Sequence, residues 1–335
     1  EPVRVAAHQG GGHAREEREA GRGAPVERLQ PAAAAGEARG VVGPQVGDQH
    51  PEDGEAARDV HAHHPAAAHG LTVENASVRI ARFTTGGDPR FALVEDNTLV
   101  VISGDPLYMP VQPTGERVPL DRDDLRLLAP VIPRSKVVGV GRNYADHARE
   151  MGNEVPATPM LFLKPNTAVI GPDDPIVLPT WSEEVHVEAE LAVVIGKVTR
   201  NVPAERALVH VYGFTVANDV TARDVQRAEQ LWTRAKGFDG SCPLGPWIVP
   251  GLDVDDLRVT ARVNGATRQD GRTSDMVHGV AELVAFASEV FTLLPGDVIL
   301  TGTPAGVGEV VHGDVVECEV EDRSEEHTSE LQSLR

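Results

Sequence analysis

An acidic pair at the start of an apolar run constrains the fold of this chain more than any other feature. Glu188 and Glu190 flank one alanine and precede LAVVIG at residues 191–196, whose β-branched side chains and final glycine predict a strand. Residues two apart on a strand project to the same face, whereas on a helix they would point about 200° apart. The pair is therefore either an ordinary solvated strand edge or the beginning of a site.

A third acid and a lysine favour a site. Two carboxylates on one apolar face raise each other's pKa unless a cation lies between them, and oxygen ligands suit Mg²⁺, Mn²⁺ or Ca²⁺ better than zinc. Asp219 lies where a predicted strand gives way to a predicted helix, and helix capping or an ion pair with Arg223 is its alternative role. Lys236 lies between aromatic residues, so we expect it to be partly buried and to need a carboxylate partner.

A second candidate site lies upstream, in a predicted turn and short helix that follow a strand ending at Gly141. Asn143 is the predicted N-cap of this helix. His147 and Glu150 are i,i+3 on one helix face, where the carboxylate can orient the imidazole as a general base for water. A surface ion pair is the alternative. The glycines of the preceding strand lack the third glycine of a dinucleotide-binding loop, which excludes that type of site.

Six segments of the chain, taken together and in this order, are more specific than any one of them: GVGRNYADHARE (139–150), FLKP (162–165), VEAELAVVIG (187–196), NDVTARDVQ (218–226), AKGFDGSCPLGP (235–246) and LTGTPAGVG (300–308). They resemble the fumarylacetoacetate hydrolase superfamily, in its acylpyruvase and 2-hydroxyhepta-2,4-diene-1,7-dioate isomerase-like branch. The resemblance covers roughly residues 78–320 and implies an α+β, β-dominant fold: a mixed β-sandwich roll, usually in a homodimer.

The same resemblance implies an enzyme that depends on Mg²⁺ or Mn²⁺, with Ca²⁺ as a third candidate ion. In relatives the histidine and glutamate activate water on a lid segment, and the lysine helps to hold developing negative charge. Carried over to this sequence, the metal ligands are Glu188, Glu190 and Asp219, the catalytic residues are His147, Glu150 and Lys236, and the substrate-binding residues are Arg142, Gln226 and Thr303.

Several reactions fit such a site. The leading hypothesis is hydrolysis of a C–C bond in a 2,4-dioxo acid, such as an acylpyruvate or fumarylpyruvate from aromatic compound breakdown, through a metal-stabilised enolate. Three carboxylates leave about three positions on a six-coordinate Mg²⁺ for a carboxylate, a 2-oxo group and water. The alternative is decarboxylation of an oxo-diacid or isomerisation of 2-hydroxyhepta-2,4-diene-1,7-dioate. A metal-binding protein without catalysis is the remote alternative.

Composition limits the partners of the chain. A net charge of −20 over 335 residues argues against nucleic acid and anionic membranes, and it predicts that a small anionic oxo-acid substrate is drawn in by local positive charge. Two cysteines without a CxxC motif favour a reducing, cytoplasmic location. No apolar run is long enough to span a bilayer, and no signal-peptide core is recognised.

The chain divides into four predicted parts. Residues 1–77 contain no aromatic residue, Ile, Met or Lys, so we expect a disordered or non-native extension. Residues 78–132 are predicted to form a small β-rich N-terminal domain, and residues 133–322 the catalytic domain. We interpret the polar tail at 323–335 as foreign sequence, and its replacement of a final family strand would leave a sheet edge exposed.

Local patterns predict several elements within these parts. The N-terminal domain is expected to contain strands at 79–83, 90–95 and 98–102. Asn264-Gly265 predicts a hairpin turn, and the apolar spacing at 281–294 predicts a helix with a core-facing side.

Overall fold

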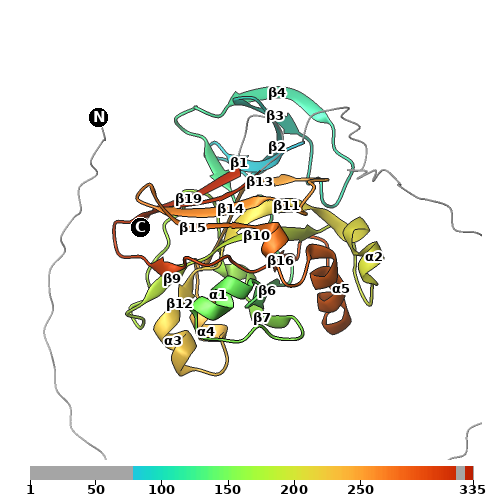
Figure 1. Cartoon of the computed structure of the whole chain (residues 1–335). Helices are drawn as coiled ribbons and strands as arrows, with labels where there is room; N and C mark the ends of the chain where they lie inside the picture. The colour runs from blue at the N-terminus through green and yellow to red at the C-terminus, as the bar shows by residue number, and fades with distance from the viewer. Residues whose placement is uncertain (1–77, 322–328, 335) are drawn as a thin grey trace, which may run out of the picture. The chain divides into compact units, whose positions relative to one another are not determined.

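The computed structural model describes residues 78–321 and 329–334. The predicted extension at residues 1–77 and most of the predicted tail at 323–335 lie outside the described residues. Strands dominate the described part and the helices are short, so the predicted α+β, β-dominant class is confirmed (Figure 1).

The largest of the three sheets in the described part has 12 strands and contains both antiparallel and parallel pairs. Its main path runs β4-β3-β2-β1-β13-β11-β10-β16-β6-β7, and β5 pairs with β1 while β8 pairs with β13. Its strands are β1 (Ile80–Thr84), β2 (Arg90–Glu95), β3 (Thr98–Ile102), β4 (Pro113–Pro119), β5 (Arg126–Leu128), β6 (Val137–Gly141), β7 (Met160–Lys164), β8 (Val169–Ile170), β10 (Ala189–Ile195), β11 (Val211–Asn218), β13 (Cys242–Val249) and β16 (Val298–Leu300).

Two smaller sheets, five short α-helices and three 3₁₀ helices complete the described part. One sheet has the order β12-β9-β17 and the other β15-β14-β18-β19. None of the described helices is long and apolar enough to cross a membrane. The remaining strands are β9 (Val185–Val187), β12 (Thr221–Ala222), β14 (Arg258–Val263), β15 (Ala266–Arg272), β17 (Gly308–Glu309), β18 (Val315–Val320) and β19 (Ser329–Leu334). The α-helices are α1 (Ala145–Glu150), α2 (Ala204–Ala207), α3 (Arg223–Ala228), α4 (Thr233–Lys236) and α5 (Val280–Val290), and the 3₁₀ helices are η1 (Asn166–Ala168), η2 (Leu208–His210) and η3 (Thr273–Asp275).

The N-terminal strands extend the large sheet. β2 and β3 coincide with their predicted ranges, and β1 is shifted by one residue from 79–83. β1 pairs with β13, with Ile80 opposite Ile248. The strands β1 to β4 therefore belong to the same sheet as β10 and β11, the two strands beside which the acids lie (Figure 1, top of the view). The predicted domain boundary between residues 132 and 133 falls between β5 and β6 and stays a prediction.

Strand β10 is buried on both faces, because its residues after Glu190 are all aliphatic. Leu191 and Val193 pack into the core that includes residues of β14, β18 and α5. Ala192 and Val194 pack on the opposite face, with residues of β13 and β16. Glu188, Glu190 and Ala192 lie on the same face of the strand, because each is two residues from the next. The two acids therefore extend this second face past its last apolar residue, Ala192.

Two local predictions are confirmed in outline. Asn264 and Gly265, with φ of 52° and 76°, connect β14 to β15 in the left-handed conformation that such a hairpin turn requires. The predicted helix at 281–294 is observed as α5, which ends sooner, at Val290. The chain leaves the helix there because Leu293 exchanges backbone hydrogen bonds with Thr199.

The C-terminal edge differs from its prediction. β19 pairs antiparallel with β18 along the whole length of β18, from Val315 to Val320. The expected exposed edge at β18 is therefore wrong. Ladder hydrogen bonds join backbone groups, so a polar segment can pair with a strand even though its composition does not predict one.

Candidate active site and metal centre

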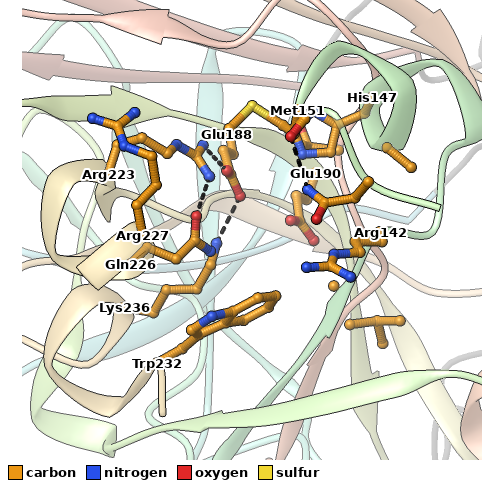
Figure 2. Close-up of a pocket in the computed structure, with 15 residues that line it drawn as sticks. Arg142, His147, Met151, Glu188, Glu190, Arg223, Gln226, Arg227, Trp232 and Lys236 are labelled. Atoms are coloured by element: carbon orange, nitrogen blue, oxygen red, sulfur yellow. Dashed lines mark hydrogen bonds and ion pairs between the residues drawn. The ribbon is translucent and has the colours of Figure 1, made fainter. Parts of the chain in front are cut away.

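A cavity of about 310 Å³ lies beside β6, α1, α3 and α4 and the acidic end of β10. In Figure 2, Arg223, Gln226 and Lys236 lie on one side of it, and Arg142, Glu190 and His147 on the other. Asp219 and Glu150 do not line the cavity but contact residues that do. The structure thus brings together all the residues to which the sequence assigns a role, and those that line the cavity are Arg142, His147, Glu188, Glu190, Gln226, Lys236 and Thr303.

The pairing of β10 with β11 gathers the three acids. Ala189 lies opposite Asn218, so Glu188 and Glu190 flank the strand end that leads into Asp219. The Asp219 N–H donates to the Glu188 carbonyl oxygen at 2.9 Å. One carboxylate oxygen from each acid lies within 4.8 Å of the others, and each residue is at most 3% exposed. The predicted metal ligands form one buried cluster.

Three buried basic side chains contact this cluster. Lys236 Nζ donates to Glu188 Oε2 at 2.8 Å and to Asp219 Oδ2 at 2.5 Å. Lys164 Nζ donates to Asp219 Oδ1 at 2.5 Å, and Arg223 donates to Glu188 Oε1. The alternative role of Asp219 as the partner of Arg223 is therefore not what the structure shows, because this arginine contacts Glu188.

These contacts set the charge states of Glu188 and Lys236. Burial alone would raise the pKa of Glu188, but the charges of Lys236 and Arg223 outweigh it and hold that pKa below its usual range. Burial alone would lower the pKa of Lys236, but Asp219 and Glu188 outweigh it and raise that pKa. Glu188 and Lys236 are therefore an ionised pair.

Glu190 is the acid of the cluster that none of these three basic side chains contacts. Its Oε2 accepts a hydrogen bond from the Gly302 N–H at 2.6 Å. Burial, together with the charges of Asp219 and Glu188, raises the pKa of Glu190 well above its usual range. A divalent cation would relieve that repulsion, and three carboxylates are the ligand type that Mg²⁺ and Mn²⁺ prefer. The donor set therefore fits a hard divalent ion.

The His147–Glu150 pair lies on α1 at the wall of the cavity. His147 Nδ1 lies 3.5 Å from Glu150 Oε2, and the Gly306 N–H donates to both oxygens of Glu150 at 3.1 and 3.2 Å. Burial lowers the pKa of His147 despite the nearby charge of Glu188, so the imidazole is held neutral. His147 is only 7% exposed, whereas the Glu150 side chain is 35% exposed, so the histidine is buried at the cavity wall and its partner still reaches solvent.

Asn143 does not cap α1, and that prediction is wrong. Tyr144 occupies the N-cap position, and its side chain makes no capping hydrogen bond. Asn143 Nδ2 donates to the carbonyl oxygens of His278 and Thr301 at 3.0 and 2.8 Å, and Oδ1 accepts from the His278 N–H at 2.9 Å. The buried amide thus ties the start of α1 to the segment that follows β16.

The predicted substrate-binding residues have different neighbours. Arg142 has a positive φ of 59°, and its guanidinium carbon lies 5.9 Å from the ring centroid of Trp232. Gln226 Oε1 accepts a hydrogen bond from Arg223. Thr303 Oγ1 donates to the Ala189 carbonyl oxygen at 2.8 Å, which joins it to the strand that carries the two glutamates.

Sequence reasoning assigns no catalytic, metal-binding or substrate-binding role to four further residues of this region. Lys164 belongs to the FLKP segment and is fully buried, and Arg223 is predicted only as a partner of Asp219. Arg227 lines the cavity and pairs with Glu184. Gln269 comes from β15 and has no sequence signal, because a glutamine among polar residues resembles an ordinary exposed strand position.

Two known families match the chain. Residues 136–330 match the family described as fumarylacetoacetate (FAA) hydrolase C-terminal, and residues 78–130 match the one described as Rv2993c-like, N-terminal. The first match spans more than half of the chain and includes the acid cluster and the His147–Glu150 pair.

Individual proteins from bacteria and mammals are similar to this chain. Protein Rv2993c of Mycobacterium tuberculosis is 53% identical over 211 residues, which are 62% of this chain and 78% of that protein. The mitochondrial oxaloacetate tautomerase FAHD2A of Bos taurus is 47% identical over 215 residues, 61% of this chain and 68% of that protein. The crystal structure of 2-hydroxyhepta-2,4-diene-1,7-dioate isomerase from Mycobacterium marinum has a TM-score of 0.68 at 45% identity, covering 77% of this chain and 98% of that chain. The chain belongs to the fumarylacetoacetate hydrolase family, and its relatives there include a protein named as an oxaloacetate tautomerase and one named as a 2-hydroxyhepta-2,4-diene-1,7-dioate isomerase.

Proposed function

We propose that this protein is a divalent-metal-dependent enzyme that interconverts keto and enol forms of a 2-oxo dicarboxylate, as a tautomerase or isomerase. The observation that carries the proposal is the arrangement of the acid cluster, the Lys236 ammonium and the neutral His147 imidazole around one cavity. The names of the tautomerase and isomerase relatives support the same chemistry.

The charge of the cavity supports an anionic substrate. The three acids of the cluster are matched by three buried basic side chains, Lys164, Lys236 and Arg223. A bound divalent ion would make this group net positive by two charges, and Arg142 and Arg227 line the same cavity. In a chain of net charge −20, such a local excess is what would draw in a dicarboxylate.

Charge on the 2-oxo oxygen would be stabilised from two directions. Glu188, Glu190 and Asp219 would hold the metal ion, which when bound acts as a Lewis acid toward that oxygen. Lys236 adds a fixed positive charge beside it, since its ammonium is held between Glu188 and Asp219 before substrate arrives.

His147 is the proposed base. With Nδ1–H directed at Glu150, the lone pair on Nε2 is available to take a proton from C3 of the oxo acid. The electrons of the C3–H bond become the C2–C3 double bond, and negative charge moves to the 2-oxo oxygen. Transfer of the proton from Nε2 to this oxygen then gives the enol and restores the neutral imidazole.

Hydrolysis of a 2,4-dioxo acid is the second candidate, and the His147–Glu150 contact favours it. The same base can take a proton from water, whose oxygen then attacks the distal carbonyl carbon. The C–C bond breaks, its electrons pass to the pyruvate part as an enolate, and protonation completes the reaction. Decarboxylation of oxaloacetate at this site would need the enolate stabilisers but no base.

A panel of substrates tests the proposal. The protein with Mg²⁺ is assayed with oxaloacetate for enol–keto exchange, with 2-hydroxyhepta-2,4-diene-1,7-dioate for isomerisation and with an acylpyruvate for hydrolysis. We expect His147→Ala to lower the rate of whichever of these three reactions the parent catalyses fastest by about 10²–10⁴-fold. Oxaloacetate decarboxylation, if present, should survive in this variant.

His278→Ala is the matched control. His278 Nδ1 lies 2.8 Å from Glu282 Oε1, so these two residues form a second histidine–glutamate pair. Neither of them lines the cavity. Equal rates in the two variants would remove His147 from the mechanism. Mn²⁺ binding without turnover of any of the three substrates would indicate a metal-binding protein that is not an enzyme.

A further inference from the structure

Gln269 is a fully buried amide in a strand whose other residues are exposed or half-buried. It is 0% exposed, and it is the only buried residue of β15. Side-chain alternation directs it from this sheet toward β10. Because buried polar groups need hydrogen-bond partners, the partners of this amide indicate its role.

The hydrogen bonds of Gln269 close a ring with Ala189 and Thr303. Gln269 Oε1 accepts from the Ala189 N–H at 2.9 Å, and Nε2 donates to Thr303 Oγ1 at 2.7 Å and to the Pro304 carbonyl oxygen at 2.8 Å. Thr303 Oγ1 in turn donates to the Ala189 carbonyl oxygen at 2.8 Å. Both backbone polar groups of the residue between the two glutamates are therefore held by one glutamine–threonine unit.

The same contacts hold the segment at residues 302–306. At one end of this segment the Gly302 N–H donates to Glu190, and at the other end the Gly306 N–H donates to Glu150. Gly306 has a φ of 100°, and a Cβ atom there would lie 2.1 Å from the Arg268 carbonyl oxygen, so the segment lies directly on β15. One glutamine thus anchors a segment that contacts both the acid cluster and the partner of the histidine.

We propose that Gln269 is a positioning residue that sets the spacing of Glu188 and Glu190 for a divalent cation and orients Thr303 toward the substrate. The inference rests on the metal dependence of the proposed function. Rotation of the peptide units around Ala189 would move both carboxylates, because both side chains leave the backbone beside it. An apolar side chain in place of Gln269 would leave the Ala189 N–H buried without its acceptor, and the strand could relieve that only by shifting.

The test measures Mn²⁺ binding to the full chain without substrate, by calorimetric titration of EDTA-treated protein. Gln269→Met keeps the volume of the side chain and removes its hydrogen bonds. We expect the Mn²⁺ dissociation constant to rise by about 10-fold or more, as is typical when groups that orient metal ligands are removed. Ser288→Ala is the control, because Ser288 is also fully buried and cross-links backbone groups of Val202 and Ala285, but does not line the cavity.

The outcomes separate the inference from the function on which it rests. Weaker Mn²⁺ binding in Gln269→Met, with Ser288→Ala binding like the parent, supports the positioning role. Equal binding in Gln269→Met and the parent overturns it while leaving the proposed function intact. A parent that binds no Mn²⁺ overturns both. If Gln269→Met does not fold, Thr303→Val opens the same ring and should weaken Mn²⁺ binding, and parent-like binding in it overturns the inference.

Discussion

Replacing Lys236 by methionine tests the charge balance of the buried cluster. Methionine keeps the apolar stem but removes the ammonium that donates to Glu188, Asp219 and Thr221. The residue is 3% exposed, so few water molecules can take the place of the ammonium beside these carboxylates. Removing one partner of a buried ion pair lowers the free energy of unfolding by about 3–5 kcal/mol. At about 2–4 °C per kcal/mol, the value for 150–250 folded residues and so for the described part of this chain, the metal-free variant should melt about 6–20 °C below the parent.

A divalent ion should reverse part of this loss, because it would neutralise the same carboxylates. Ligand binding stabilises a folded protein by about 2.7 kcal/mol when the ligand is present at 100 times its dissociation constant, and by more when binding tightens. We therefore expect Mn²⁺ to raise the melting temperature of Lys236→Met more than that of the parent at equal concentration. Calorimetric melting of EDTA-treated protein, with and without Mn²⁺, measures both quantities.

Lys136→Met is the matched control for this experiment. Lys136 Nζ donates to Asp297 at 2.7 Å, and that carboxylate is fully buried, but neither residue lines the cavity. This variant should melt lower than the parent and show the parent's Mn²⁺-induced shift. An unchanged melting temperature for Lys236→Met in EDTA, or equal Mn²⁺-induced shifts in parent and Lys236→Met, would refute the reasoning.

Asp219→Asn should abolish Mg²⁺-dependent turnover with an unchanged circular dichroism spectrum, and full turnover of the metal-free parent would contradict the ligand assignment. Because the base must be neutral and burial lowers the pKa of His147, kcat/KM should fall as pH drops, with a midpoint below the ordinary imidazole value of about 6.5. If the residual kcat/KM of His147→Gln still fell at low pH, titration of another group would cause the fall. Asn143→Leu should speed amide hydrogen exchange in α1, because the hydrogen bonds that tie its start to the neighbouring segments are lost, and unchanged exchange by mass spectrometry would show that it is no anchor.

Local sequence patterns determine the elements that carry the acids. The aliphatic run after Glu190 predicts a strand, and the two-residue period places Glu188 and Glu190 together, as observed. The strands at 90–95 and 98–102 and the Asn264-Gly265 hairpin are likewise set by residues within a few positions of one another. Periodicity and turn chemistry are properties of neighbours in the chain, so the sequence alone predicts them.

The partners of the acids depend on contacts that local patterns do not contain. Arg223 lies four residues after Asp219, a spacing that predicts an ion pair on a helix, yet α3 begins only at Arg223 and its guanidinium contacts Glu188. Asn143 precedes a helix, as an N-cap would, but its amide is used by segments more than a hundred residues away. In both cases a distant partner satisfies the side chain in place of the local one.

The sequence by itself therefore determined the strands, the acid pair and the family resemblance, and the tertiary structure decided what neutralises and orients the acids. Lys164 reaches Asp219 from the end of β7, and Gln269 reaches Ala189 from a different sheet, 80 residues along the chain. Which strands lie side by side, and which sheet covers which face, is set by packing of the whole core. The hydrogen-bond partner of a buried polar side chain is set by that packing, so it becomes visible only when the strands are in place.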